Sequence, residues 1–156
     1  VLIKAIQQLP SNVALLLAGT GSLQAQLQEL VCTLGLEQRV FFLGHVENMS
    51  SFYSLLDVFC LSSSNEGLPL SPMEAQACGV PAVLTDVGGC KEAVCRKTGL
   101  VVQPNNAELL GEALNKVLNQ KMRQSPRAFI KNHRSMKKMI NQYISLTQAE
   151  LRWKLC

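Results

Sequence analysis

Short apolar runs alternate with stretches of helical periodicity along most of this chain. The five runs are VALLLAG at 13–19, RVFFLG at 39–44, VFCLSS at 58–63, VPAVLT at 80–85 and GLVVQP at 99–104. Continuous apolar runs of this length are typical of strands that are buried on both faces of a parallel sheet. We therefore expect five parallel strands.

Helical spacing of apolar residues marks the segments between and after these runs, at 22–35, 49–57, 71–78 and 106–120, with a helical turn at 90–94. Strands that alternate with helices predict an α/β fold, a Rossmann-like doubly wound parallel sheet covered by helices on both faces. Residues 1–120 form this predicted domain. Residues 121–156 are basic with a helical period and predict a C-terminal helical tail, in which Pro126 begins a helix.

Ligands of such sheets bind beyond the carboxyl ends of the strands. Four loops rich in Gly, Ser and Asn follow the first four predicted strands, at 19–21, 44–46, 62–66 and 85–89. We expect these loops to converge on one edge of the domain. The pair Gly88 and Gly89 in the last loop is interpreted as a tight turn.

Composition narrows the function classes. The chain has 156 residues, of which 47% are hydrophobic and 5% aromatic, enough for one aliphatic core. The net charge of +4 is mild and much of it follows Lys121, so no nucleic-acid groove is expected. No run approaches the ~18 apolar residues of a membrane span. The six cysteines include no CxxC pair, and we interpret them as reduced, buried thiols of a cytoplasmic protein without a zinc site.

The most informative stretch is EGLPLSPME at 66–74, which places Glu66 and Glu74 eight positions apart. A structural interpretation explains the second carboxylate alone: Ser71 caps a helix, Pro72 occupies its first position, and Glu74 completes a capping box. A functional interpretation explains both. Backbone N–H groups from Gly67 to Ser71 then face an anion at a helix start, with a carboxylate on either side.

A carboxylate is a good bidentate acceptor for a vicinal diol, so the two glutamates suit the two ends of a nucleotide sugar. EGLPLSPMEAQACGVPAV also resembles the E-x7-E signature of retaining, nucleotide-sugar-dependent glycosyltransferases with two Rossmann domains, the GT-B architecture. The segments LLLAGTGSLQ, RVFFLGHV, DVFCLSS, TDVGGCKEAV and TGLVVQPNNAELLGEAL resemble the same family in the same order, so that the likeness covers residues 1–118.

The resemblance implies that this chain is the C-terminal, donor-binding half of such an enzyme, with the first strand and part of the first helix of the domain missing. Glu66 is then the catalytic-site residue that contacts the donor sugar, and Glu74 binds the ribose hydroxyls. The donor sugar and diphosphate are expected against Gly67, Leu68, Pro69, Leu70 and Ser71. The nucleobase and nucleotide are expected at Val46, Gly19 and Gly21.

The family transfers a sugar from a nucleotide diphosphate to an acceptor with retention of anomeric configuration, in glycan, polysaccharide or glycolipid biosynthesis. It needs neither a cofactor nor a metal. The resemblance places the acceptor, a carbohydrate or lipid-linked glycan, on an N-terminal domain. The family's G-R-L…K-G loop, which supplies positive charge to the diphosphate, does not occur in the sequence. An isolated fragment is therefore expected to be poorly active.

Other functions stay open at this point. The chain could be a non-catalytic nucleotide-sugar-binding module or a truncated, inactive fragment. A sugar-nucleotide epimerase of related shape fits the E-x7-E stretch less well. The basic tail is a solvated helix, crosses back to the first domain, as the resemblance implies, or contacts an anionic membrane at its inner face.

Overall fold

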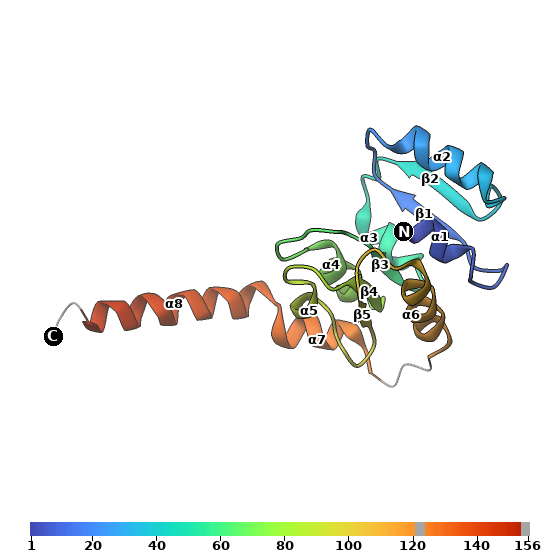
Figure 1. The fold of residues 1–156 in the computed structure, drawn as a ribbon. Coiled ribbons are helices and arrows are strands. Elements are labelled where there is room, and N and C mark those ends of the chain that lie inside the picture. Colours follow the sequence, from blue (N-terminus) through green and yellow to red (C-terminus); the bar gives the residue numbers. More distant parts are fainter. Residues whose placement is uncertain (121–123, 154–156) are drawn as a thin grey trace.

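The computed structural model describes residues 1–120 and 124–153, which form an α/β domain followed by a long helix (Figure 1). The strands are β1 (Leu15–Ala18), β2 (Val40–Gly44), β3 (Phe59–Leu61), β4 (Ala82–Thr85) and β5 (Leu100–Val102). The helices are α1 (Leu2–Ile6), α2 (Gln24–Thr33), α3 (Met49–Ser54), α4 (Ser71–Ala77), α5 (Cys90–Ala93), α6 (Ala107–Asn119), α7 (Pro126–His133) and α8 (Met136–Trp153). Each of the five predicted strands is present, within its predicted bounds.

All strand pairs are parallel, as predicted, but the strands form two groups instead of one sheet. One group is β1–β2 and the other is β3–β4–β5. A groove of about 740 Å³ lies between them, and its lining includes residues 15–18 of β1 and 58–61 around β3. The α/β fold with parallel strands is as predicted; β1 and β3 do not pair, because a groove separates them and pairing needs strands within ~4.8 Å of each other.

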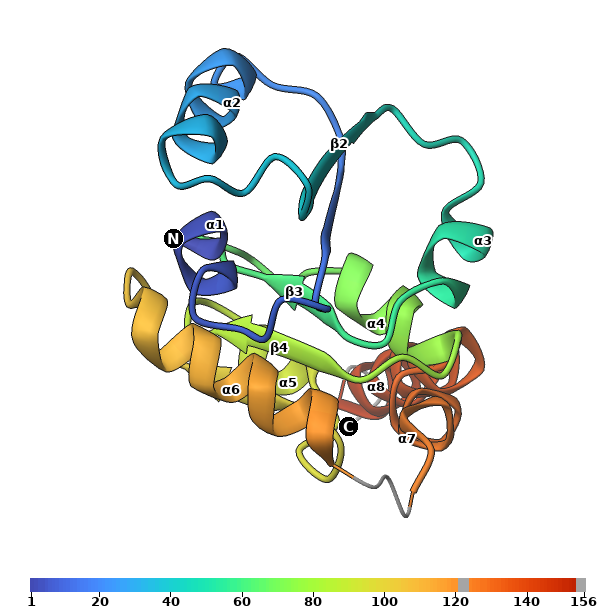
Figure 2. The same cartoon turned by 90° about the vertical axis from the view of Figure 1, so that its right-hand side faces the viewer.

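Helix α1 packs against both groups of strands. Its Ile3 belongs to the core of β1 and β2, together with Val31 of α2. Its Ala5 belongs to a second core, which contains Val83 of β4 and Leu110 of α6. Figure 2 shows α6 running alongside β4 and below α1. The two groups of strands are thus joined by packing of apolar side chains rather than by a strand ladder.

Arg39, just before β2, holds the segment between α1 and β1 in place. Its guanidinium donates hydrogen bonds to four backbone carbonyls, those of Val13 (2.9 Å), Ile6 (3.0 Å), Leu9 (3.2 Å) and Pro10 (2.9 Å). These carbonyls belong to the end of α1 and the approach to β1. An arginine fork that satisfies four acceptors fixes the turn between the two elements.

Strand β4 is buried on both faces, as predicted, but β2 is not: on its outer face Phe41 is 43% and Leu43 is 42% exposed. Val83 faces the core shared by α1 and α6, whereas Ala82 and Leu84 pack against Cys90 and Ala93 of α5. All four β4 residues are buried. Period-two alternation thus sends neighbouring side chains into two different cores.

The tail is helical, as predicted. Pro126 begins α7, which packs against α4, and α8 then extends away from the domain (Figure 1). Along α8, large apolar side chains are exposed, among them Met136 (73%) and Tyr143 (65%). Residues 121–123 and 154–156 of the predicted tail, Cys156 included, lie outside the described residues. None of the described helices is both long enough and apolar enough to span a bilayer.

Candidate functional site

The loops that follow the parallel strands are joined in pairs, the loop after β1 with that after β2, and the loop after β3 with that after β4. The loop after β1 is tied to the end of β2, because Gly19 N–H donates to the carbonyl of Gly44 at 2.7 Å. Both residues have positive φ, +117° for Gly19 and +64° for Gly44, a conformation that favours glycine. Gly21 and Val46 follow these two glycines, so the structure brings the three predicted nucleotide-binding positions into neighbouring loops.

The carboxylate of Glu66 is oriented by the ends of two strands. Ser63 Oγ donates a hydrogen bond to Glu66 Oε1 at 2.7 Å. Thr85, at the end of β4, in turn donates from Oγ1 to the carbonyl of Ser63 at 2.6 Å. Thr85 is 1% exposed, so this contact is firmly placed. Within the described part of the chain, Glu66 Oε2 has no protein donor and remains available to a ligand.

Gly88 and Gly89 do more than form a tight turn. Gly89 N–H donates to the carbonyl of Gly67 at 2.6 Å. A Cβ added at Gly88 would collide with the carbonyl oxygen of Glu66, and one added at Gly89 would lie 2.8 Å from the carbonyl oxygen of Gly67. Because neither glycine has a Cβ, the loop after β4 can lie in contact with the backbone of Glu66 and Gly67.

Glu74 lies in the first turn of α4, but it takes no part in a capping box. The N-cap of α4 is Leu70, not Ser71, and no side chain caps the helix. The reason is that Leu70 already has helical dihedrals (φ −83°, ψ −38°) and its carbonyl accepts the first helical bond, from Glu74 N–H at 2.9 Å. The structural interpretation of Glu74 was therefore wrong.

The Glu74 carboxylate is held instead by a tyrosine. Tyr53 of α3 is 2% exposed, and its hydroxyl donates to Glu74 Oε2 at 2.9 Å. Burial first, and then the hydrogen bond and charge of Glu74, raise the pKa of the Tyr53 phenol well above its usual range. The phenol is thus a neutral donor at physiological pH. Val46 packs against the same cluster, which also contains Phe52 and Ala75.

The residues between the two glutamates offer backbone donors and an apolar surface. Within residues 1–120 and 124–153, no protein acceptor is bonded to the N–H groups of Gly67, Leu68, Leu70 or Ser71. Pro69 is buried, whereas the side chains of Leu68 (51%) and Leu70 (66%) are largely exposed. The loop thus turns two leucines outward, beside N–H groups that remain free to donate hydrogen bonds to a ligand.

Gln76 fixes the orientation of α4. Its side chain is fully buried and makes three hydrogen bonds, donating to the carbonyls of Pro72 (2.8 Å) and Ala93 (2.7 Å) and accepting from Cys95 N–H (2.7 Å). The last two bonds tie α4 to the segment around α5. Because a buried amide with all these partners tolerates little displacement, it helps to set the position of Glu74, two residues before it on the same short helix.

Sequence reasoning missed four residues of this site: Tyr53, Ser63, Gln76 and Thr85. The only signal for Tyr53 was its rarity, since the chain has two tyrosines. For Gln76, a polar residue on the apolar side of a predicted helix was the available sign. Among the described residues, no group of three or more His, Cys, Asp and Glu is placed to bind a metal ion.

Comparison with known proteins assigns the family. The model of the glycosyl transferases group 1 family matches residues 1–136. The chain belongs to this family. It is 37% identical over 93 residues to the lipopolysaccharide core biosynthesis mannosyltransferase LpsB of Rhizobium meliloti, covering 58% of this chain and 26% of that protein. It is 33% identical over 136 residues to a GDP-mannose-dependent phosphatidylinositol monomannoside mannosyltransferase of Corynebacterium glutamicum, covering 80% of this chain and 35% of that protein.

Solved structures agree with this assignment. HepE of Anabaena, in complex with UDP-glucose, superposes with a TM-score of 0.83 at 27% identity, over 96% of this chain and 44% of HepE. Sucrose-phosphate synthase of Thermosynechococcus elongatus gives a TM-score of 0.82 at 26% identity, over 97% of this chain and 41% of that protein. The predicted α/β fold of a GT-B glycosyltransferase is thereby confirmed. The chain spans roughly a third of the curated relatives named above and less than half of these solved structures.

Proposed function

We propose that this glycosyltransferase chain binds a nucleotide-diphosphate sugar and is the donor-binding part of an enzyme that transfers the sugar with retention of anomeric configuration. The observation that carries the proposal is the state of the two carboxylates. Each has one oxygen fixed by a protein hydroxyl, from Ser63 for Glu66 and from Tyr53 for Glu74. The second oxygen of each has no protein donor among the described residues and can accept from sugar hydroxyls.

Each predicted site residue receives a role in this proposal. Glu66 accepts from hydroxyls of the transferred sugar, and Glu74 accepts from the ribose. The sugar and diphosphate lie between them against Gly67, Leu68 and Pro69, with the phosphates at the N–H groups of Leu70 and Ser71. The nucleobase lies at Val46, above the turn of Gly19 and Gly21. The complex of HepE with UDP-glucose, at 27% identity, supports a donor of this class.

The chemistry follows from the charge that develops during transfer. The bond from the anomeric carbon to the diphosphate breaks through an oxocarbenium-like transition state, so charge accumulates on the leaving phosphates. Glu66 positions the sugar ring and is not required to form a covalent bond. We propose no metal for this step. A missing donor to such a leaving group costs on the order of 10²–10³ in rate, so residues 1–156 alone are expected to bind the donor but transfer poorly.

We also propose that the groove between β1 and β3 takes a further parallel strand. Helix α1 leads directly into β1, and a helix before a parallel strand is ordinarily the second part of a right-handed strand–helix–strand unit. The groove is next to β1, where the first strand of that unit would lie. A variant that carries five valine and isoleucine residues and a short turn before Val1 should have a higher midpoint of thermal unfolding. A control with serine and glycine in place of the valine and isoleucine should not.

The exposed side chains of α8 suit a partner surface. We propose that α8 contacts the acceptor-binding domain that the resemblance implies, and that the acceptor is a carbohydrate or lipid-linked glycan. A peripheral contact with an anionic membrane is the competing proposal, supported by Lys137 and Lys138 beside exposed Met136 and Ile140. Cosedimentation with anionic and neutral vesicles separates the two.

We propose a cytoplasmic location, since all five cysteines in the described residues are free thiols.

The test of the donor site is isothermal calorimetry with a panel of nucleotide sugars and the matching free nucleoside diphosphates. Glu74→Gln should weaken both kinds of ligand at least tenfold. Glu66→Gln should weaken only the sugar-bearing ligand. Glu112→Gln, at an exposed position of α6, is the matched control and should change neither. Equal losses for Glu66→Gln with both ligands would remove Glu66 from the sugar site.

Binding without transfer is the second candidate function. An assay of sugar transfer decides between them: activity of a longer chain that includes an acceptor domain supports the enzyme, and donor binding without turnover in that chain supports a binding module.

A further inference from the structure

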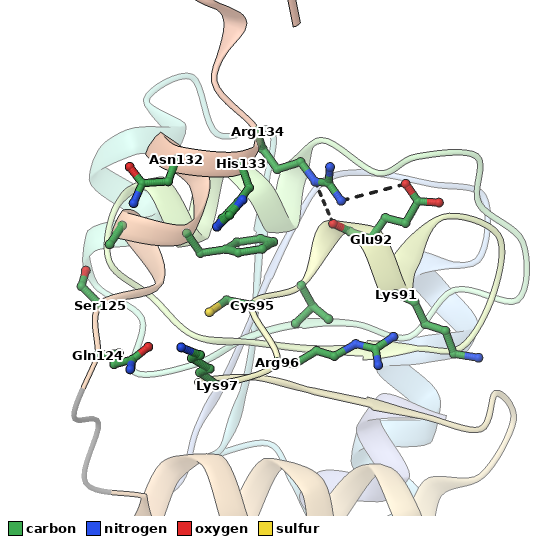
Figure 3. A pocket seen from close by; sticks show the side chains of 13 residues that line it. Lys91, Glu92, Cys95, Arg96, Lys97, Gln124, Ser125, Asn132, His133 and Arg134 are labelled. Carbon is green, nitrogen blue, oxygen red and sulfur yellow. Dashed lines mark hydrogen bonds and ion pairs between the residues drawn. The ribbon is translucent and has the colours of Figure 1, made fainter. Parts of the chain in front are cut away.

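A second pocket lies away from the candidate donor site. It has a volume of about 580 Å³ and is formed by α7 and by the segment from α5 to β5 (Figure 3). That segment enters the amino end of β5, whereas the donor site lies at the carboxyl ends of the strands. None of the residues assigned to the donor lines the pocket. A volume of this size is within the range of small-molecule sites.

The floor of the pocket is apolar. Val94 and Cys95, which are 2% and 5% exposed, line it from the segment after α5, and Ala128 and Phe129 line it from α7. The Phe129 ring is tilted against that of His133, with centroids 5.4 Å apart. A hydrocarbon group placed on this floor would be removed from water, which favours binding in proportion to the apolar area buried.

The rim of the pocket is cationic. Four Lys and Arg side chains line it against a single carboxylate, that of Glu92: Lys91, Arg96, Lys97 and Arg134. The rim alone thus carries a formal charge of +3, in a chain whose total is +4. Figure 3 shows Arg96 and Lys97 on one side of Cys95, with His133 and Arg134 on the other.

The four cations differ in how they are engaged. Lys91 pairs with Asp86 at 2.7 Å. Arg134 donates from Nε to the carbonyl of Glu92 at 3.0 Å and lies 4.0 Å from its carboxylate. Arg96 and Lys97 have no ion pair within the described ranges. Both side chains are exposed, and an anion bound in the pocket would supply the counter-charge that they lack there.

We propose that this pocket binds a phosphate ester with an apolar substituent. The phosphate lies between Arg96, Lys97 and Arg134, and the substituent lies on Val94 and Phe129. A phosphate carries nearly two negative charges and accepts paired hydrogen bonds from a guanidinium, so it balances this rim better than a carboxylate does. The ester is either a soluble metabolite or the headgroup of a phosphatidic lipid, since both present the same chemistry.

The first test compares probes on the wild-type protein by calorimetry. Hexyl phosphate should bind at least tenfold more tightly than inorganic phosphate, because only the ester also covers the floor. Hexyl glucoside, which has the same chain without charge, should show no saturable binding. Hexyl phosphate that binds no better than inorganic phosphate, or not at all, overturns the proposal.

Variants locate the binding. Arg96→Gln combined with Lys97→Gln should weaken hexyl phosphate at least tenfold. Lys4→Gln combined with Lys116→Gln removes the same charge from exposed positions elsewhere and should leave the affinity unchanged. Equal losses in the two double variants overturn the proposal. Ala128→Trp, an exposed substitution that fills the floor, should weaken hexyl phosphate and spare inorganic phosphate.

Vesicles distinguish the two sources of the ester. Vesicles of phosphatidylcholine with phosphatidic acid should retain the wild-type protein more than the Arg96→Gln, Lys97→Gln variant if the ester is a lipid headgroup. Equal retention of the two proteins, together with specific binding of hexyl phosphate, assigns the pocket to a soluble ester. Neither outcome depends on donor binding at Glu66 and Glu74, so this proposal and the proposed function fail separately.

Discussion

The contact between the two glycines and the Glu66 loop predicts a strong effect of a single methyl group. Gly88→Ala places a Cβ against the carbonyl oxygen of Glu66 and forces alanine to adopt φ +48°. The backbone conformation alone costs about 1–2 kcal/mol. Relief of the collision moves the loop and lengthens the hydrogen bond from Gly89 N–H to Gly67, which costs about 1 kcal/mol more.

The expected loss of unfolding free energy is therefore about 2–3 kcal/mol, and it should come with weaker donor binding because the Glu66 carboxylate moves with its backbone. Urea unfolding followed by circular dichroism measures the first quantity, and calorimetry with the preferred nucleotide sugar measures the second. Gly35→Ala is the matched control. Gly35 also has positive φ, +65°, but an added Cβ there meets nothing within 4 Å.

Gly35→Ala should thus lose about 1–2 kcal/mol of stability and keep the wild-type donor affinity. The reasoning is refuted if both variants lose the same stability and both retain the affinity. That result would mean that the loop after β4 is a simple turn whose close approach to Glu66 has no effect on the site.

Three further substitutions test the supports of the fold and the site. Gln76→Leu leaves buried partners unpaired and should cost about 3 kcal/mol in urea unfolding, whereas a loss below 1 kcal/mol would contradict the role of this amide. Arg39→Lys cannot reproduce the fork on four carbonyls and should cost about 2 kcal/mol, with Lys4→Met, an exposed change on α1, as a control that stays within 0.5 kcal/mol. Tyr53→Phe removes the hydrogen bond to Glu74 and should cost about 1 kcal/mol at pH 7. The pKa of the Tyr53 phenol is higher in the folded chain than its unfolded value of 10.0. The contribution of the phenol to stability is therefore complete below pH 10.0 and is lost as the pH rises from 10.0 toward the folded pKa. When the pH is raised from 7 to above 10.0, Tyr53→Phe should thus lose less unfolding free energy than wild type.

Strands and helices were predictable because the buried faces of this fold impose simple periods on the sequence. Each apolar run became a strand, but two covered faces explain the continuous apolar pattern only for β4, since Phe41 and Leu43 of β2 are exposed. Which strands pair with one another was not predictable in the same way. The split between β1 and β3 depends on which backbones come within hydrogen-bonding distance, and side-chain patterns carry no record of that distance.

The candidate site was predictable only in part. The E-x7-E stretch singled out Glu66 and Glu74, because carboxylates near prolines and a glycine stand out in an apolar chain. Their partners, Ser63 and Tyr53, come from other elements, and their identity as donors depends on the three-dimensional meeting of these elements. The capping box failed for a local reason: Leu70 adopts a helical conformation one residue before the predicted cap.

The groove between β1 and β3 has a consequence for handling the protein. Each of its walls is a strand edge whose backbone donors and acceptors are not engaged by the other, and such edges recruit extended segments of neighbouring molecules. We expect concentrated samples to associate through this groove, with growth of light scattering that slows when the edges are blocked. Light scattering from concentrated samples therefore reports whether the groove between β1 and β3 is occupied.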